Sequence, residues 1–339
     1  MAFWATQSIN RRDAILPRGA IPPPTLAAET PLPGDDFSWK VCAEEDTPAI
    51  AAFLTTHYTL AVSEAHVKWA MSKRTVAVAL LHGRDQHDTI VAFALCMRCP
   101  MVLDGTVYPR TFVGNYLCVH TEFRGRHMAG RVIRECIRRN LAMGFVTGVM
   151  TRVNFDDPSR ALPVTTKALY QCDVGTASRN VFKTVAFSPE HHDAHLASWL
   201  TPTSQHHIAC QWSPEEVARW FEGHKRAFHI RVCLDGDGTP VSAFATHLTT
   251  KKEDAANNKF AIGYFHVGAQ LEKTFGTALH MAHLLGATTY IYWQRGVKDI
   301  RFLRAHNARR LPSSLSFYTF GCSAGRAPRH DCDVGLMLV

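Results

Sequence analysis

The stretch Gly114–Ala129, GNYLCVHTEFRGRHMA, changes its pattern half-way along. The first part continues the apolar run TFVGNYLCVH, which is typical of a buried β-strand. A short basic loop, Arg124–His127, follows it. After the loop, apolar residues recur at a spacing of three to four, which is typical of one face of a helix: Val132, Ile133, Cys136, Ile137 and Leu141. The stretch therefore predicts a strand, a basic loop and a helix.

This order of elements suits a phosphate. The first turn of a helix has unpaired N–H groups and the positive end of the helix dipole. Gly125 lets the backbone approach a ligand closely, and Arg124 and Arg126 add positive charge. The alternative is a basic loop that merely covers the start of a helix. A loop of this pattern also resembles the one with which acyl-CoA transferases of the GNAT fold hold the CoA pyrophosphate. There an Arg or Gln is followed five positions later by a small residue, here Arg124 and Ala129.

The same succession of elements is expected twice along the chain. The first round consists of helix patterns at 44–58 and 63–71, a hairpin at 74–97, the strand at 111–120, the helix described above and a further strand. A helix capped by Ser213, two strands around the turn DGDGTP, a strand, a helix and a strand form the second. We therefore expect an α+β fold of two similar halves, with mixed sheets flanked by helices. The expected boundaries are 1–36 (an extended, Pro-rich arm), 37–190, 191–212 (a linker) and 213–339.

Composition excludes several classes of protein. Of the 339 residues, 46% are hydrophobic and 19% charged, as in a globular protein, and no run is long enough to predict a transmembrane helix. The net charge of +8 comes from dispersed basic residues without a nucleic-acid-binding motif, so we expect a phosphorylated small molecule or an acidic partner instead of nucleic acid.

The positions of the cysteines and histidines bear on the redox state of the thiols and on metal binding. The ten cysteines are scattered through apolar runs, which predicts reduced, buried thiols and a cytoplasmic protein. A single CxxC, Cys96–Cys99, and the pair His191 and His195 have no further ligands at metal-site spacing, so no metal is expected. The start of the chain lacks the pattern of a signal peptide. We also expect the protein to be a monomer.

Several landmarks, in order, resemble the N-myristoyltransferase (glycylpeptide N-tetradecanoyltransferase) family. They are FWATQ at 3–7, PLPGDDFSWKVC at 31–42, FLTTHY at 53–58, NYLCVH at 115–120 (with Tyr116 where the family has Phe), SPEEVARWF at 213–221, FLRAHNARRLPSSLSFYTF at 302–320 and VGLMLV at 334–339. The resemblance implies two fused GNAT-like halves related by a pseudo-twofold axis. It also implies transfer of a myristoyl group from myristoyl-CoA, a co-substrate, to the α-amino group of an N-terminal glycine. The first half would bind myristoyl-CoA, and the second would bind the peptide.

The resemblance also assigns roles to residues. The backbone N–H groups of Tyr116 and Leu117 would form the oxyanion hole, and Asn115 and Thr151 would lie close to the incoming glycine. The α-carboxylate of Val339 would be the base. Acyl-CoA would contact ten residues: Phe3, Trp4, Cys118, Val119, Arg124, Gly125, Arg126, His127, Met128 and Ala129.

A terminal carboxylate can act as a base only in a dry site. In water its pKa is about 3.3–3.7, well below the roughly 7.7–8.0 of an α-amino group. Burial of the apolar run Gly335–Val339 would desolvate the carboxylate and raise its pKa. Without the other landmarks, the same ending would be read as a last strand with no chemistry.

Three departures from the family concern peptide recognition. Glu64 is the one acid where the family has an acidic run, and Leu311–Ser313 replaces a Gly-Asp-Gly. Between Thr151 and Tyr170 the family's aromatic and histidine pocket residues are mostly missing, and Lys167 lies near the histidine position. We therefore expect a changed peptide preference. The alternatives are a member that binds acyl-CoA or peptide with little turnover, and a short-chain GNAT acetyltransferase.

Overall fold

The computed structural model describes residues 18–20, 29–58, 60, 62–83, 89–153, 165–176, 181–202, 206–221, 227–250, 259–294, 299–325 and 333–334. Phe3, Trp4 and Val339 lie outside these residues, as do most of the arm expected at 1–36 and the Gly335–Val339 run.

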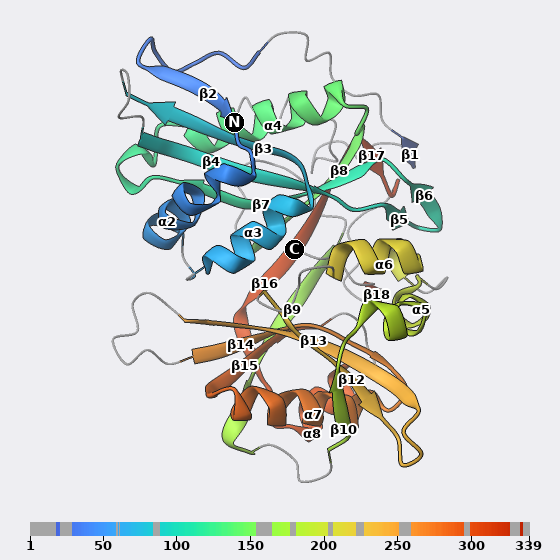
Figure 1. Ribbon diagram of the computed structural model, residues 1–339. Helices are drawn as coiled ribbons and strands as arrows, with labels where there is room; N and C mark the ends of the chain where they lie inside the picture. The colour runs from blue at the N-terminus through green and yellow to red at the C-terminus, as the bar shows by residue number, and fades with distance from the viewer. Residues whose placement is uncertain are drawn as a thin grey trace.

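A single mixed sheet of 12 strands runs through the molecule, and the first half of the chain builds one end of it (Figure 1). The neighbouring strands there are β8, β7, β4, β3 and β2. The elements of this half are β2 (Phe37–Val41), η1 (Glu44–Asp46), α2 (Thr47–His57), α3 (Glu64–Ser72), β3 (Arg74–His82), β4 (Thr89–Arg98), β7 (Thr111–Val119), η2 (Thr121–Phe123), α4 (Met128–Ala142) and β8 (Thr147–Val153).

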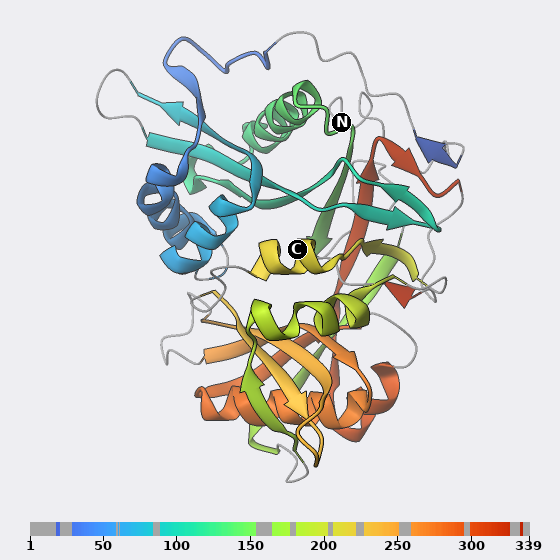
Figure 2. The same ribbon diagram turned by 45° about the vertical axis from the view of Figure 1, so that its right-hand side comes forward.

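The second half repeats this arrangement at the other end of the sheet (Figure 2). Its elements are α5 (Pro189–Leu200), α6 (Pro214–Phe221), β12 (His229–Leu234), β13 (Pro240–Thr250), β14 (Lys259–Gly268), α7 (Leu271–Leu284), β15 (Ala287–Trp293) and α8 (Asp299–Ala305). In each half a hairpin is followed by two parallel strands joined by a crossover helix: β7, α4 and β8 in the first, and β14, α7 and β15 in the second.

Each half of the chain contributes one strand that pairs with a strand of the other half. β9 (Thr165–Asp173) pairs with β15 of the second half, and β16 (Arg309–Phe320) pairs with β8 of the first. β9 and β16 pair with each other at the centre of the sheet. β10 (Lys183–Ala186), after the 3-10 turn η3 (Val174–Thr176), is an edge strand of the sheet and pairs with β12. The arrangement confirms the expected α+β fold of two similar halves. Strands β9 and β10, which precede residue 190, lie among those of the second half.

Continuous apolar runs build these strands because helices cover both faces of the sheet. Six consecutive residues of β3, Val76–Leu81, are buried. Val76, Val78 and Leu80 contact the cluster beneath α4, whereas Ala77, Ala79 and Leu81 belong to the core between the halves. A third cluster lies beneath α7.

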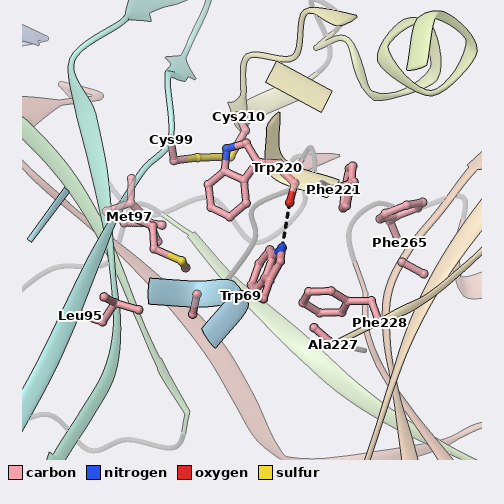
Figure 3. Close-up of a cluster of buried hydrophobic side chains, with 14 of the residues drawn as sticks. Trp69, Leu95, Met97, Cys99, Cys210, Trp220, Phe221, Ala227, Phe228 and Phe265 are labelled. Atoms are coloured by element: carbon pink, nitrogen blue, oxygen red, sulfur yellow. Dashed lines mark hydrogen bonds between the residues drawn. A yellow bond between two sulfur atoms is a disulfide. The ribbon is translucent and has the colours of Figure 1, made fainter. Parts of the chain in front are cut away.

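The core between the halves contains the tryptophans of two helices (Figure 3). Trp69 of α3 donates a hydrogen bond through Nε1 to the Trp220 carbonyl oxygen of α6, at 2.8 Å, and its ring lies 4.6 Å from that of Phe228. Elements of both halves are therefore locked together beside the sheet.

A second, four-stranded sheet is built from three distant parts of the chain. β5 (Met101–Leu103) and β6 (Thr106–Tyr108) form a hairpin, β11 (His206–Cys210) pairs with β5, and β18 (Asp333–Val334) pairs in parallel with β11. The stretch 191–212, expected as a linker, thus contributes most of α5 and the strand β11. A further strand pair joins β1 (Gly19–Ala20) to β17 (Cys322–Ser323).

The prediction that the cysteines are reduced is wrong for one pair. Cys99, between β4 and β5, forms a disulfide with Cys210 at the end of β11, 111 residues away. Both side chains are buried, and the β5–β11 pairing brings them together, a contact that the sequence spacing does not reveal. The other seven cysteines that the structure describes are buried and form no disulfide.

Replacing Gly321 by alanine is expected to lower the free energy of unfolding by about 2–5 kcal/mol. Gly321 has a φ of +69°, and a Cβ there would overlap the Val146 carbonyl oxygen. Left-handed backbone costs about 1–2 kcal/mol, and overpacking adds about 1–3 kcal/mol. Gly238→Ala is the matched control, because Gly238 has a φ of +83° with open space around it. Urea denaturation that gave equal losses for both variants would contradict the clash.

Of the helices that the structure describes, none is both long and apolar enough to cross a membrane.

Candidate active site

Strand β7, which contains Asn115–Val119 of the family landmark NYLCVH, has a bulge near its end. Asn115 pairs with Leu95 of β4 and Cys118 pairs with Phe93, so Tyr116 and Leu117 together lie opposite the single residue Ala94. Tyr116 has a φ of +53°, a left-handed conformation that costs a bulky residue about 1–2 kcal/mol. Backbone strain of this kind is typical of functional sites.

The sheet opens beside this bulge. β7 pairs with β8 only from Thr111 to Gly114, and the last pair is Gly114 with Met150. Asn115 and Thr151 are the next residues on the two strands, so they stand on the two sides of the opening. Beyond this point β8 continues to pair with β16, where Thr151 lies opposite Phe317. The structure therefore places Asn115, Tyr116, Leu117 and Thr151 at the same opening of the sheet.

This geometry suits an oxyanion hole. Among the described residues, Tyr116 and Leu117 have no cross-strand partner, because the bulge removes them from the β4 ladder and β8 has already diverged. Leu117 is 40% exposed although it is apolar and lies in a core strand. Two successive backbone N–H groups at a sheet opening can donate to an oxygen that becomes negatively charged.

Rings from both halves surround a small cavity next to the bulge. It has a free volume of about 10 Å³, room for about one water molecule. Its lining comes from α3, β4 and β7 in the first half and from the β12–β14 region in the second: His66, Trp69, Met97, Asn115, Tyr116, Phe228 and Tyr264. Neither His66 nor Tyr264 is among the site residues that the sequence predicts. The spacing of His66 and Trp69 on one face of α3 was the available signal.

His66 forms a contact between the halves with His247 of β13. The two Nδ1 atoms are 3.3 Å apart, and His247 Nδ1 is 2.9 Å from the Ala227 carbonyl oxygen. A carbonyl can only accept, so His247 Nδ1 carries the hydrogen that Ala227 binds. Burial, with a smaller effect from His247, lowers the pKa of His66 to about 3, and burial also lowers the pKa of His247. Both imidazoles are therefore neutral near pH 7.

Acid is expected to destabilise the protein through His66. Its pKa in the unfolded chain is 6.5, so as the pH falls below 6.5 the unfolded state binds a proton before the folded state does. The stability is complete above pH 6.5 and is lost progressively towards pH 3. At pH 5 the loss amounts to about 2 kcal/mol. Urea unfolding of His66→Phe should lose less stability between pH 8 and 5 than the wild type, and His280→Phe on α7 is the control. Equal acid sensitivity in all three proteins would contradict this assignment.

The basic loop after β7 has the backbone expected of an anion site. Gly125 and His127 are left-handed, with φ of +79° and +60°, and α4 begins at Met128. The left-handed φ is the reason for a glycine at position 125. Crowding is not the reason, because a Cβ there would have no neighbour within 4 Å. Arg124 donates to the His57 carbonyl oxygen at 2.7 Å and to the Val119 carbonyl oxygen at 3.3 Å, so it also ties the loop to α2.

The remaining residues expected at the acyl-CoA site lie around this loop. Arg126 is exposed and its guanidinium lies 5.2 Å from the centre of the Phe123 ring. Cys118 and Met128 are buried, whereas Val119 and Ala129 are half-buried. Exposed cations and left-handed backbone at the start of a 15-residue helix fit a phosphate.

The described end of the arm is fixed to α4. The Thr30 N–H donates to the buried Glu135 carboxylate at 3.0 Å, and Arg131 donates to the Pro31 carbonyl oxygen at 2.6 Å. Burial alone would raise the pKa of Glu135, but hydrogen bonds from Arg138, Thr30 and Arg139 lower it to about 2. Residues 29–31 therefore lie against the helix that starts at the basic loop.

Residues of all three departures are described, although 154–164 of the third lie outside the described part of the chain. Glu64 is exposed at the start of α3. Leu311–Ser313 lies where the β16–β9 register shifts, and Lys167 is buried in β9 opposite Leu315. Val153 of β8 also lies opposite Leu315, so Lys167 is two strands from the Thr151 strand. Among the described residues, no group of three metal-ligating side chains gathers, including around His191 and His195 on α5.

Comparisons with known proteins agree with this geometry. Residues 27–156 match the family described as "Myristoyl-CoA:protein N-myristoyltransferase, N-terminal domain". Crystal structures of Saccharomyces cerevisiae N-myristoyltransferase with bound myristoyl-CoA have a TM-score of 0.81 and 15% identity, over 100% of this chain and 94% of that chain. A structure of that enzyme with myristoyl-CoA and inhibitors gives 0.80 and 14%, over 99% and 95%.

A probable N-acyltransferase from Enterococcus faecalis V583 is more distant, with a TM-score of 0.50 and 9% identity over 84% of this chain and 72% of that chain. The comparison with curated protein sequences found no match. Residues 27–156 therefore match the N-terminal domain of the N-myristoyltransferases by sequence, and the whole chain shares the fold of the yeast enzyme.

Proposed function

We propose that this protein transfers a myristoyl group from myristoyl-CoA to the α-amino group of an N-terminal glycine. The observation that carries the proposal is the bulge at Tyr116 and Leu117, which lies at the sheet opening and is followed by the basic loop and α4. The same strand thus offers donors for a thioester carbonyl and leads directly to an anion site. The relatives of known structure contain bound myristoyl-CoA.

The reaction is a nucleophilic acyl transfer. The neutral glycine amine attacks the thioester carbonyl carbon, and the carbonyl oxygen becomes an oxyanion that accepts from the Tyr116 and Leu117 N–H groups. Collapse of this intermediate breaks the C–S bond, and CoA leaves as the thiolate while an amide forms. The basic loop from Arg124 to His127 holds the CoA phosphates, and Asn115 and Thr151 orient the glycine.

The amine must lose a proton for this reaction. The resemblance to the family assigns this role to the α-carboxylate of Val339, which lies outside the described residues. The nearest described segment is β18, whose pairing with β11 fixes the chain at Val334. From Val334, an extended chain of five residues reaches at most about 17 Å.

Mass spectrometry of peptides incubated with the protein and myristoyl-CoA tests the proposal. The panel contains glycine-ended peptides with basic, acidic and uncharged residues at later positions, each paired with the same peptide starting with alanine. We expect a mass gain of one myristoyl group on glycine peptides only, and turnover that does not require a lysine, because Glu64 is the one acid left in its segment.

Other results would point to the alternatives. Tight binding of myristoyl-CoA without any product would indicate a non-catalytic acyl-CoA-binding protein. Faster transfer from acetyl-CoA than from myristoyl-CoA, measured by competition, would indicate a short-chain acetyltransferase. Either result would overturn the proposed function.

A further inference from the structure

Strand β11 is linked at both of its ends to the first half of the chain. The two links, which we call the clamps, are the Asp104–His207 hydrogen bond and the Cys99–Cys210 disulfide. At its start, His207 Nδ1 donates to the Asp104 carboxylate at 2.6 Å, and the Asp104 N–H donates to the His207 carbonyl oxygen at 2.8 Å. At its end, the Cys99–Cys210 disulfide and a 2.7 Å hydrogen bond from the Gln211 N–H to the Pro100 carbonyl oxygen hold it (Figure 3).

Both clamps come from the same hairpin of the first half. Asp104 and Gly105 are the two turn residues between β5 and β6, and both are left-handed, with φ of +48° and +77°. Asp-Gly is the preferred sequence for a two-residue hairpin turn of this type. The turn therefore places the Asp104 carboxylate beside His207, while Cys99 lies just before β5.

The other edge of β11 receives β18. Asp333 lies opposite His206 and Val334 opposite Ile208, in a parallel pairing. β18 is the last described segment of the chain, and β11 is its strand partner in the four-stranded sheet. The register of β11 therefore sets where the polypeptide lies as it approaches its last residues.

We propose that Asp104–His207 and Cys99–Cys210 are positioning residues that hold β11 as a template for the C-terminal segment. This inference rests on the proposed function, because the segment leads to the proposed base at Val339. Loss of either clamp lets β11, and β18 with it, shift relative to the oxyanion donors of β7. A displacement of about 1 Å in a reacting group costs about 100-fold in rate.

The disulfide makes this positioning sensitive to thiols. A dithiol reductant supplies two electrons and two protons to the Cys99–Cys210 bond, which becomes two thiols, and the reductant leaves as its own disulfide. We therefore expect reduction to lower kcat for transfer to a glycine peptide by about 10–100-fold. The KM for myristoyl-CoA should stay unchanged, because the loop and α4 are fixed independently of β11.

Matched variants separate positioning from simple destabilisation. The double variant Cys99→Ser/Cys210→Ser should lose kcat as the reduced protein does, and dithiothreitol should have no further effect on it. Asp104→Gly removes the carboxylate without straining a left-handed residue, and it should also lower kcat at constant KM for myristoyl-CoA. The controls are Cys42→Ser/Cys233→Ser, two free cysteines, and Asp237→Gly in the β12–β13 turn. Both should resemble the wild type, and all assays are run where circular dichroism shows folded protein.

Hydrogen exchange gives a readout that is independent of turnover. Amide exchange of a C-terminal peptide that contains Asp333 and Val334 should become faster on reduction and in both clamp variants, and should not change in the controls. Folded variants with full kcat, a rise in KM for myristoyl-CoA that accounts for the loss, or unchanged exchange would each overturn the inference. If the oxidised wild type acylates no peptide, the proposed function fails, and the exchange data still decide whether the clamps position β18.

Discussion

Leu117→Pro is expected to lower kcat for myristoyl transfer by about 100–1,000-fold, the usual effect of removing one oxyanion donor. Proline has no N–H group, so the variant deletes the second of the two proposed donors. Leu117 is the suitable position because its side chain is 40% exposed and lies in the unpaired part of the bulge. The change therefore removes no bond of the β4–β7 ladder.

Leu117→Ala is the matched control, since it shortens the side chain and keeps the N–H group. We expect its kcat to remain close to that of the wild type. Myristoyl-CoA binding, measured by calorimetry, should be retained in both variants because Arg124, Gly125 and α4 are unaffected. If the proline and alanine variants turned over equally fast, the bulge would not be the oxyanion hole. If the proline variant lost myristoyl-CoA binding as well, the change would report distortion of β7.

The sequence predicts the local elements of this fold well because they depend on local patterns. The strand, loop and helix from Thr111 to Ala142 appear where the apolar spacing places them, and Ser213 accepts from the Glu216 N–H at the start of α6. Helix α2 begins at Thr47 with Asp46 as its N-cap, and the Asp46 carboxylate accepts a hydrogen bond from the Ala43 N–H of the preceding 3-10 turn.

What the sequence does not predict depends on contacts between distant segments. The sequence around Cys99 and Cys210 does not indicate a disulfide, because the two cysteines come together only through the pairing of β5 with β11. His66 and His247 lie in unrelated segments and meet only because the two halves pack together. Likewise, the exchange of β9 and β16 between the halves has no signal in either strand, since both sequences, TTKALYQCD and RRLPSSLSFYTF, mix polar and apolar residues. The family resemblance, in contrast, predicted Asn115, Tyr116, Leu117 and Thr151 as one site, and the register of β7 and β8 puts all four at the opening of the sheet. Their roles in the reaction stay a prediction.

Adding a short Gly-Ser tail after Val339 is expected to lower kcat by about 100–10,000-fold, the range of a general base. The tail converts the Val339 carboxylate into an amide, which cannot accept a proton from the glycine ammonium. The new carboxylate lies beyond the tail and in water, where its pKa of about 3.3–3.7 makes it a poor base. Binding of myristoyl-CoA should persist, because the basic loop and α4 belong to the first half of the chain.

The same Gly-Ser residues inserted in the turn at Asp235–Gly238 form the control, because that hairpin joins β12 and β13 at the far end of the sheet. Two readouts are needed, single-turnover transfer to a glycine peptide and calorimetric binding of myristoyl-CoA. The expected pattern is full binding with slow transfer for the tailed protein, and both properties intact for the insertion. Because the amine must lose its proton before or during attack, raising the pH from 7 to 9 should partly restore transfer in the tailed protein, as hydroxide and water take over the role of base. A tailed protein that transfers as fast as the wild type at pH 7 would show that another group removes the proton.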